Sequence, residues 1–195
     1  MLSLITRQTM AGLRILVAFT LLLGVAYPVA VWAIAQLPGL SHQAAGSAIT
    51  APDGTVVGSS LIGIDPVAAD PAADPWFHTR PSAAPDGASG GSNKSGSNAD
   101  LLASVQERRA QVAAREGVDP ALVPPDAVTA SASGLDPDIS PAYAQLQVAR
   151  VAKVTGLPVE RVQELVAQAT SGRILGFLGE PAVNVAQLNL AVRGR

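Results

Sequence analysis

The chain has 195 residues, no cysteine and a formal net charge of −2. The lack of cysteine excludes a disulfide framework and a thiolate metal site. All 15 acidic residues follow residue 35, together with 11 of the 13 basic ones, which leaves a formal charge of −4 there. This acidic balance argues against nucleic-acid binding, which requires a basic surface.

Residues 15–34 form an apolar run without a charged side chain. Twenty residues of helix span roughly 30 Å, the thickness of a bilayer's hydrocarbon core, so we expect a transmembrane helix at 15–35. Arg7 and Arg14 precede the run, and the next basic residue is Arg80. The positive-inside rule therefore places 1–14 in the cytoplasm and 36–195 outside it, at the cell membrane. A cleaved secretory signal is the alternative, and it also exports the remainder of the chain.

Pro28 lacks a backbone N–H and is expected to kink the membrane helix. Thr20, Gly24 and Pro28 are spaced by four residues, and small residues at this spacing let another helix approach closely. They are our candidates for transmembrane docking. The alternative is that small residues are simply common in membrane helices.

Two extended runs, 48–50 and 55–62, flank Asp53-Gly54, which is typical of a β-hairpin turn. Residues 65–75 are expected to form a loop. By composition alone, the glycine- and serine-rich residues 83–98 indicate a disordered linker.

Three helices are expected beyond this linker, each with a start signal. Asn98 caps a helix over 99–116 that ends before Gly117, with Leu102, Val105 and Val112 on one face. Ser140 caps a helix from Pro141 to about Thr155, which Gly156 terminates. Residues 118–141 between them are proline-rich and mostly irregular.

The third helix runs from Pro158 to about Thr170, and its predicted apolar face holds Val159, Val162, Leu165, Val166 and Ala169. Near the C-terminus, Asn184 caps a last short helix or lies in a strand. The predicted fold class is α+β: one membrane helix followed by a small extracytoplasmic domain in which helices cover a short sheet.

Gln147 lies within the apolar stripe of the 141–155 helix. Because an unpaired buried amide costs roughly 1–3 kcal/mol, we expect it to bond a backbone group or a partner. Arg80, before Pro81, is expected to be a structural arginine that bonds loop carbonyls.

Three possible functional sites, a phosphate-binding loop, a metal site and a hydrolytic set, have weaker support than a purely structural role for the same residues. Ser89–Asn93 and Lys94 lack the spacing of a phosphate-binding loop. The aspartates at 126, 136 and 138 offer too few oxygens for a hard cation, and Asp138 is expected instead to form turn bonds or bonds at the entry to the following helix. His78 with Ser82, Ser131 or Ser133 lacks a nucleophile-elbow pattern, so we predict no catalytic residue and no metal site.

Several runs, taken in their order along the chain, resemble the KdpC family: 58–63, 76–83, 89–93, 129–141, 147–152, 178–181, 183–185 and 188–190. No single run is diagnostic, but the ordered set is specific and covers nearly the whole chain. The chain departs from the family's pattern at Ile64, Lys94 and Asp138. The residues carried over from the family's motifs are Phe77, His78, Arg80, Pro81, Ser82, Ser92, Asn93, Ser133, Gly134, Asp136, Arg150, Gly179, Glu180 and Asn184.

This resemblance implies a non-catalytic accessory subunit of an ATP-driven high-affinity potassium uptake complex. Its implied partners are a channel-like potassium-selecting subunit, which with the rest of the complex handles the potassium, and an ATP-hydrolysing P-type subunit. The family is described as a catalytic chaperone that raises the ATP affinity of the hydrolysing subunit. Gln147 matches a glutamine proposed to contact the nucleotide, and no cofactor is expected to stay bound.

The predicted topology conflicts with a direct nucleotide contact, because ATP is cytoplasmic and Gln147 is placed outside. Our hypothesis is that the external domain caps the potassium-selecting subunit and affects ATP affinity only indirectly. The alternative function is a stand-alone, membrane-anchored extracytoplasmic binding module.

Overall fold

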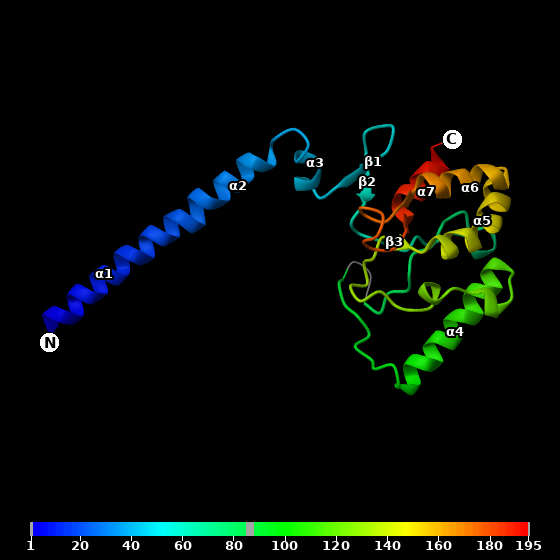
Figure 1. Ribbon diagram of the computed structural model, residues 1–195, viewed down its shortest axis with the longest axis horizontal. Coiled ribbons are helices and arrows are strands. Elements are labelled where there is room, and N and C mark those ends of the chain that lie inside the picture. Colours follow the sequence, from blue (N-terminus) through cyan, green and yellow to red (C-terminus); the bar gives the residue numbers. More distant parts are fainter. Residues whose placement is uncertain (1, 85–87, 195) are drawn as a thin grey trace. The chain divides into compact units, whose positions relative to one another are not determined.

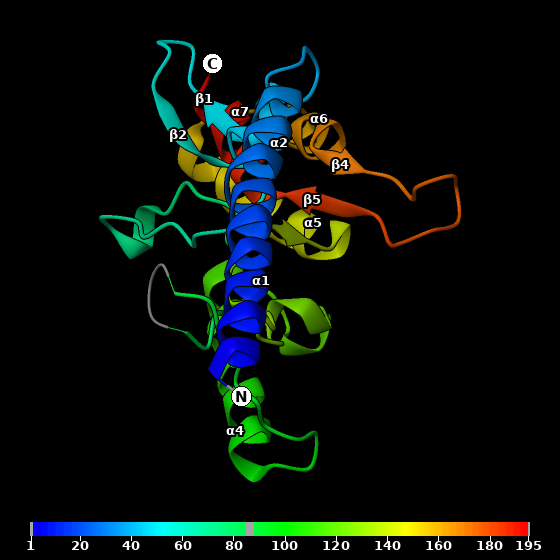
Figure 2. The same ribbon diagram turned by 90° about the vertical axis from the view of Figure 1, so that its left-hand side faces the viewer.

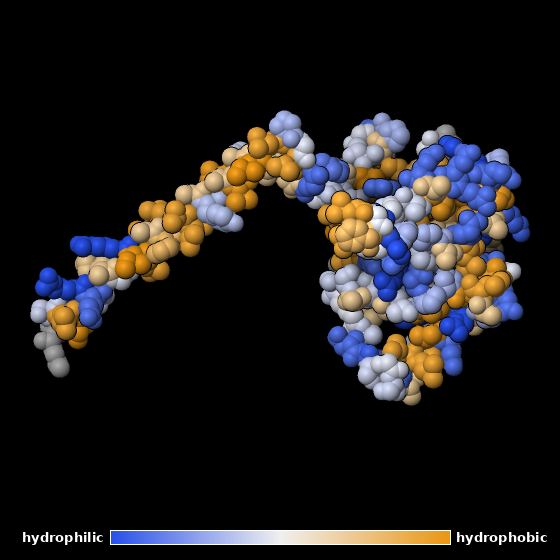
Figure 3. Space-filling model, viewed as in Figure 1, coloured by the Kyte–Doolittle hydropathy of each residue, from blue (hydrophilic) through white to orange (hydrophobic). Residues whose placement is uncertain are grey.

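The computed structural model describes residues 2–84 and 88–194, and the chain divides into two units, 1–47 and 48–195 (Figure 1). The first unit is one continuous helical rod made of α1 (Leu2–Leu21), a π-helical turn (Leu22–Ala26) and α2 (Tyr27–Ala35), followed by the short α3 (Ser41–Ala44). The helix therefore begins well before the predicted span. From Ser3 to Ala35 it is long and apolar enough to cross a membrane, and none of its most apolar stretch is buried within the chain (Figure 3).

Pro28 is accommodated by the π-helical turn directly before it. The N–H of Tyr27 donates to the carbonyl of Leu22, five residues earlier, so the ladder widens where the proline cannot donate. The disturbance expected from Pro28 thus takes the form of one wide turn in an otherwise unbroken helix.

The second unit begins with the predicted hairpin, β1 (Ala48–Thr50) paired antiparallel with β2 (Val56–Ser59). Gly54 adopts a φ of +86°, and the Asp53 carboxylate accepts hydrogen bonds from the N–H and hydroxyl of Thr55. The second strand is shorter than the sequence indicates. Residues 65–75 form a loop with one 3₁₀ turn, Pro71–Ala73.

The predicted caps are present at the helices of this unit. In α4 (Ala99–Glu116) the Asn98 side chain accepts from the N–H of Leu101, and in α5 (Pro141–Thr155) Ser140 accepts from Tyr143. Left-handed glycines follow both helices, at 117 and 156. The segment between them is irregular apart from 3₁₀ turns at Pro120–Leu122 and Pro125–Ala127 and the strand β3 (Asp138–Ile139).

A three-stranded antiparallel sheet has the order β3-β5-β4, with β4 at Thr170–Ser171 and β5 at Ala182–Asn184. α6 (Val159–Gln168) packs against α5, and α7 (Val185–Arg193) follows β5 directly. Asn184 fulfils both expectations for it, since it ends β5 and its side chain accepts from the N–H of Gln187 at the start of α7.

The core lies between these helices, the sheet and the segment around Phe77. Two residues predicted to face it do not: Leu102 is 59% exposed and Val159 is 43% exposed. Both lie in the first turn of a helix, where the neighbouring elements no longer cover the apolar face. The fold is a mixture of helices and small antiparallel sheets, preceded by the long apolar helix. The buried apolar residues include Phe77, Val128, Ile139, Tyr143, Ala144, Val148, Val151, Val162, Val183, Val185 and Leu188.

Residues 89–91 of the glycine- and serine-rich segment pack against residues 132–133. The N–H of Gly90 donates to the Ser133 carbonyl at 2.8 Å, and the Ser89 hydroxyl donates to the same oxygen at 3.0 Å. A Cβ at Gly91 would lie only 2.9 Å from the Ala132 carbonyl oxygen. Composition alone indicates a disordered linker, whereas the two family motifs that fall within 82–98 favour an ordered segment, and the contacts of residues 89–91 agree with the second expectation.

We predict that Gly91→Ala lowers the unfolding midpoint of the purified full chain in detergent, corresponding to a loss of about 1–3 kcal/mol, because backbone must move to admit the methyl group. Gly96→Ala is the matched control, since no atom lies within 4 Å of its added Cβ. Equal midpoints for both variants and the unmodified chain would show that the 88–98 segment is not packed as described.

Candidate functional site

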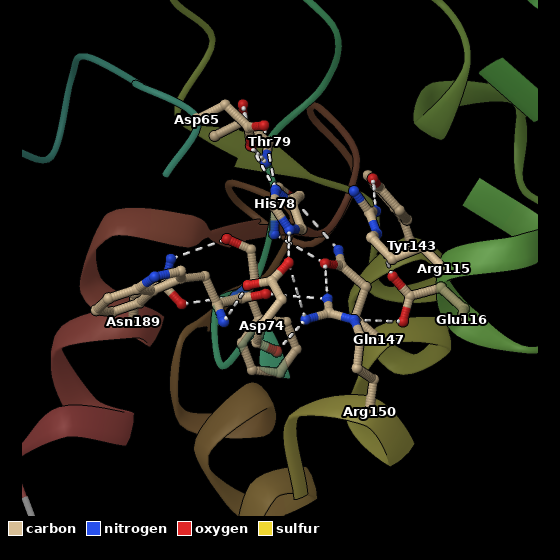
Figure 4. A network of polar contacts seen from close by, with 12 residues as sticks. Asp65, Asp74, His78, Thr79, Arg115, Glu116, Tyr143, Gln147, Arg150 and Asn189 are labelled. Carbon is tan, nitrogen blue, oxygen red and sulfur yellow. Dashed lines mark hydrogen bonds and ion pairs between the residues drawn. The ribbon is translucent and has the colours of Figure 1, made fainter. Parts of the chain in front are cut away.

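An extended segment, residues 74–80, passes through the interior of the second unit outside either sheet. Phe77 is completely buried, and His78 and Thr79 are each 7% exposed. Buried peptide groups need hydrogen-bond partners. The partners of Phe77 and His78 are the side chains of Asn189 and Gln147, which Figure 4 labels.

Two side-chain amides pair with successive residues of this segment. The Phe77 N–H donates to Asn189 Oδ1 at 2.8 Å, and Asn189 Nδ2 donates to the Phe77 carbonyl at 2.8 Å. On His78 the same two bonds are made with Gln147, at 2.8 Å and 3.3 Å. A primary amide carries a donor and an acceptor side by side, as a neighbouring strand would. The two residues, on α7 and α5, therefore replace the missing strands, and we call them the amide clamps.

Gln147 is 0% exposed, and its partner is a backbone group, as predicted from its place in the apolar stripe. Its Oε1 also accepts from Arg150 Nη2 at 3.1 Å. Both polar atoms of this side chain are thus engaged inside the domain.

Arg150 lies one turn further along α5 and binds the same segment. Its Nη1 donates to the Asp74 carbonyl at 2.7 Å, and its Nη2 donates to the Trp76 carbonyl at 2.9 Å. Its Nε donates to Glu116 Oε2 at 2.9 Å. The Glu116 carboxylate is fully buried, so this ion pair is shielded from water.

Glu116 also binds a second guanidinium. Its Oε1 accepts from Arg115 Nε at 2.7 Å, and Arg115 Nη2 donates to the Tyr143 hydroxyl at 2.9 Å. Burial raises the pKa of the Tyr143 phenol, although Arg115 acts in the opposite direction. A buried carboxylate is costly without charge partners, and here two arginines supply them.

His78 lies between two carboxylates. Its Nε2 is 2.5 Å from Asp74 Oδ2, and its Nδ1 is 3.1 Å from both oxygens of Asp65. Each ring nitrogen thus lies within hydrogen-bond distance of a carboxylate. The ring therefore has no nitrogen available for a serine, which leaves the hydrolytic reading without support.

Burial alone would raise the pKa of the Asp74 carboxyl. Hydrogen bonds from His78 and from the Trp76 N–H, together with the charges of His78 and Arg150, outweigh that effect and hold its pKa below the ordinary value. Asp74 is thus an ionised, buried partner of both basic groups.

Arg80 fixes the next part of the chain. Its Nη1 donates to Asp136 Oδ2 at 2.9 Å, and its Nη2 donates to the carbonyls of Thr129 and Ala130 at 3.4 and 3.5 Å. The prediction that Arg80 bonds loop carbonyls is confirmed, and Asp136 is an additional ionic partner.

The helix-start role predicted for Asp138 belongs to Asp126. The Asp126 carboxylate accepts from the N–H and the hydroxyl of Ser140, at 2.7 and 2.9 Å. Asp138 instead lies in β3 and accepts from Asn184 Nδ2 at 3.1 Å, which sequence proximity to Ser140 could not reveal. Burial raises the pKa of the Asp138 carboxyl, and the charge of Asp136 adds to that effect.

Asp126, Asp136 and Asp138, which were considered as metal ligands, thus bind Ser140, Arg80 and Asn184 respectively. Within residues 2–84 and 88–194, no cluster of three or more histidine, aspartate or glutamate side chains is arranged to hold a metal ion.

The remaining predicted residues lie around this network or apart from it. The Ser131 N–H donates to the Pro81 carbonyl, the hydroxyls of Ser131 and Ser133 are 3.1 Å apart, and Gly134 adopts a φ of +72° against Ser82. Asn184 also donates to the Ser60 carbonyl. Elsewhere, on exposed segments, are Ile64, Ser92, Asn93, Lys94, Gly179 and Glu180.

Five members of the network were missed by the sequence analysis: Asp65, Asp74, Arg115, Glu116 and Asn189. The clamp residue Asn189 is 112 positions from Phe77, so no local pattern connects them. The available signal was that Asn189 lies within the run 188–190, which resembles the family, between two apolar residues of the last helix.

A model of the family described as "KdpC: K+-transporting ATPase, c chain" matches residues 9–194. The chain belongs to the KdpC family. Membership identifies it as a non-catalytic accessory subunit of a potassium-transporting ATPase.

Curated KdpC subunits align with nearly the whole chain. The potassium-transporting ATPase KdpC subunit of Kineococcus radiotolerans is 51% identical over 191 residues, covering 96% of this chain and 93% of that protein. The KdpC subunit of Streptomyces avermitilis is 47% identical, with the same coverage. That of Mycobacterium tuberculosis is 45% identical, covering 95% of this chain and 97% of the relative.

We predict that Gln147→Leu lowers the free energy of unfolding by about 1–3 kcal/mol for each His78 backbone group left without a partner. Leucine is similar in size but has neither donor nor acceptor. Gln163→Leu, on the exposed face of α6, is the matched control and should change stability by less than about 0.5 kcal/mol. Chemical unfolding of the full chain in detergent measures both; equal stabilities would show that the clamp on His78 contributes nothing.

Proposed function

We propose that this KdpC-family chain is a single-pass subunit whose domain, residues 36–195, lies outside the cytoplasm and stabilises assembly of an ATP-driven potassium uptake complex. The observation that carries this proposal is the family match over residues 9–194 together with one apolar helix that is unburied in the chain. Arg7 and Arg14 lie in α1 before the uncharged run 15–34, which supports a cytoplasmic N-terminus.

We propose that the partners are a channel-like potassium-selecting subunit and an ATP-hydrolysing P-type subunit, with the bilayer around the helix. The potassium ion is then handled by those partners. The membrane helix is a further docking element at Thr20, Gly24 and Pro28, because small residues spaced by four let another helix approach closely.

Direct nucleotide binding through Gln147 is the least supported part of the family description. The side chain is fully buried, and its two polar atoms are occupied by His78 and Arg150. A nucleotide would have to displace the extended segment 74–80 to reach the Gln147 side chain. We therefore propose that any effect on the ATP affinity of the hydrolysing subunit is an indirect coupling between sites, and that no cofactor stays bound to this chain.

The two functional readings differ in potassium-limited growth. In a host whose own subunit is deleted, we predict that this chain, expressed with its cognate partners, restores growth at micromolar potassium and co-purifies with two larger membrane subunits. The partners expressed without it should fail to support growth, while millimolar potassium should remove the difference. Normal growth without the chain, combined with purification as a solitary protein, would favour the stand-alone binding module.

A further inference from the structure

A cavity of about 710 Å³ lies between the β1–β2 hairpin and α7, which are neighbours in both ribbon views (Figures 1 and 2). Ile49 and Val56 line it from the hairpin, and Val185 and Leu190 line it from α7. The Trp76 side chain, on the extended segment, completes this apolar lining. Sites for small molecules have volumes of roughly 300–1,000 Å³ and are mostly apolar with a few placed polar groups. The cavity therefore has the size and the lining of a ligand site.

The hairpin wall of this cavity is fixed by contacts just after β2. Asn184 Nδ2 donates to the Ser60 carbonyl at 2.9 Å, and the Gly63 N–H donates to the Leu135 carbonyl at 2.9 Å. A Cβ at Gly63 would collide with the Asp136 carbonyl, so the two stretches of backbone are in direct contact there. Because these contacts hold the hairpin beside α7 without filling the space between them, the cavity is preformed, which reduces the ordering that binding costs.

The polar side chains of Asn189 and Thr79, which also line the cavity, are already paired within the domain. Asn189 binds the N–H and the carbonyl of Phe77, and the Thr79 hydroxyl donates to Asp65 Oδ1 at 3.3 Å. A sugar or a nucleotide would bury polar groups that find no partner on these side chains, which is unfavourable. The interior of the cavity therefore favours a hydrocarbon ligand.

Arg193 is the one charged residue among the described residues that line the cavity. Its guanidinium carbon lies 4.8 Å from the centre of the Trp76 ring, and within residues 2–84 and 88–194 no carboxylate pairs with it. A planar guanidinium binds a carboxylate through two parallel hydrogen bonds. Its full positive charge exceeds the partial negative charge, about half an elementary charge, at the C-terminal end of α7. The cavity thus combines an apolar interior with one group that selects an anion.

We propose that this cavity binds a long-chain fatty acid, with the hydrocarbon chain between the hairpin and α7 and the carboxylate on Arg193. One positive charge beside one apolar chamber matches a ligand with one anionic head group and one chain, whereas a diacyl phospholipid has two chains. All residues of the site belong to the second unit, so it goes beyond the proposed function and does not depend on the partner subunits.

Photolabelling of the full chain in phosphatidylcholine nanodiscs tests the site. Palmitate that carries a diazirine in the middle of its chain should, after irradiation, label residues 49–64 or 185–193, as located by mass spectrometry. An excess of unmodified palmitate should abolish this labelling, whereas uncharged methyl palmitate and an anionic diacyl phospholipid should not. Labelling confined to the membrane helix, or equal competition by either of those two lipids, would overturn the proposal.

A charge variant tests the head-group contact. Arg193→Gln should lower labelling of the cavity about tenfold, because it removes charge-assisted hydrogen bonds to the carboxylate. Arg109→Gln is the matched control, since Arg109 is an exposed arginine of α4 that does not line the cavity, and it should leave the labelling unchanged. Equal labelling of the Arg193→Gln variant and the unmodified chain would contradict the proposed contact.

A filling variant tests the hydrocarbon site without altering charge. Gly58 pairs with Ile49 across the hairpin, and no atom lies within 4 Å of a Cβ added at Gly58. Because directly paired residues share a face of the hairpin, Gly58→Phe should place its ring in the cavity and remove the labelling. Gly96→Phe, at an equally open position outside the cavity lining, is the control and should label as the unmodified chain does. Undiminished labelling of Gly58→Phe would refute the site.

Discussion

The second unit depends on the pairing of one buried extended segment with side chains instead of strands. Gln147 and Asn189 satisfy the N–H and carbonyl groups of His78 and Phe77 from opposite helices. Without these four bonds the segment would place unpaired peptide groups in an apolar core, at roughly 1–3 kcal/mol each. The clamps thereby join α5 and α7 through residues 77 and 78, which lie far from both helices in the sequence.

The charged groups around the clamps follow from the same constraint. Arg150 binds the carbonyls of Asp74 and Trp76 that the amides do not reach, and its charge is balanced by the buried Glu116. These polar atoms are committed to bonds within the domain. They also argue against Gln147 as a ligand-binding residue, because its hydrogen-bonding groups are already in use.

Features with local causes were predictable: the caps at Asn98 and Ser140, the glycine stops at 117 and 156, and the Asp53-Gly54 turn. The family motifs included Phe77, His78 and Arg150 of the network, but they did not indicate which hydrogen bonds these residues form. Pairings across 69 and 112 residues depend on tertiary packing and leave no periodic signal. Leu102 and Val159 were misassigned for a related reason, because periodicity defines a helix face without showing where its neighbours end.

The most direct test is to determine on which side of the membrane the domain with the amide clamps lies. The chain has no cysteine, so single variants Ala103→Cys, exposed on α4, and Gln8→Cys, exposed on α1, report their own positions. With a membrane-impermeant maleimide on intact cells, the account predicts labelling at 103 and labelling at 8 only after lysis. The reverse pattern would place Gln147 in the cytoplasm beside ATP and contradict indirect coupling.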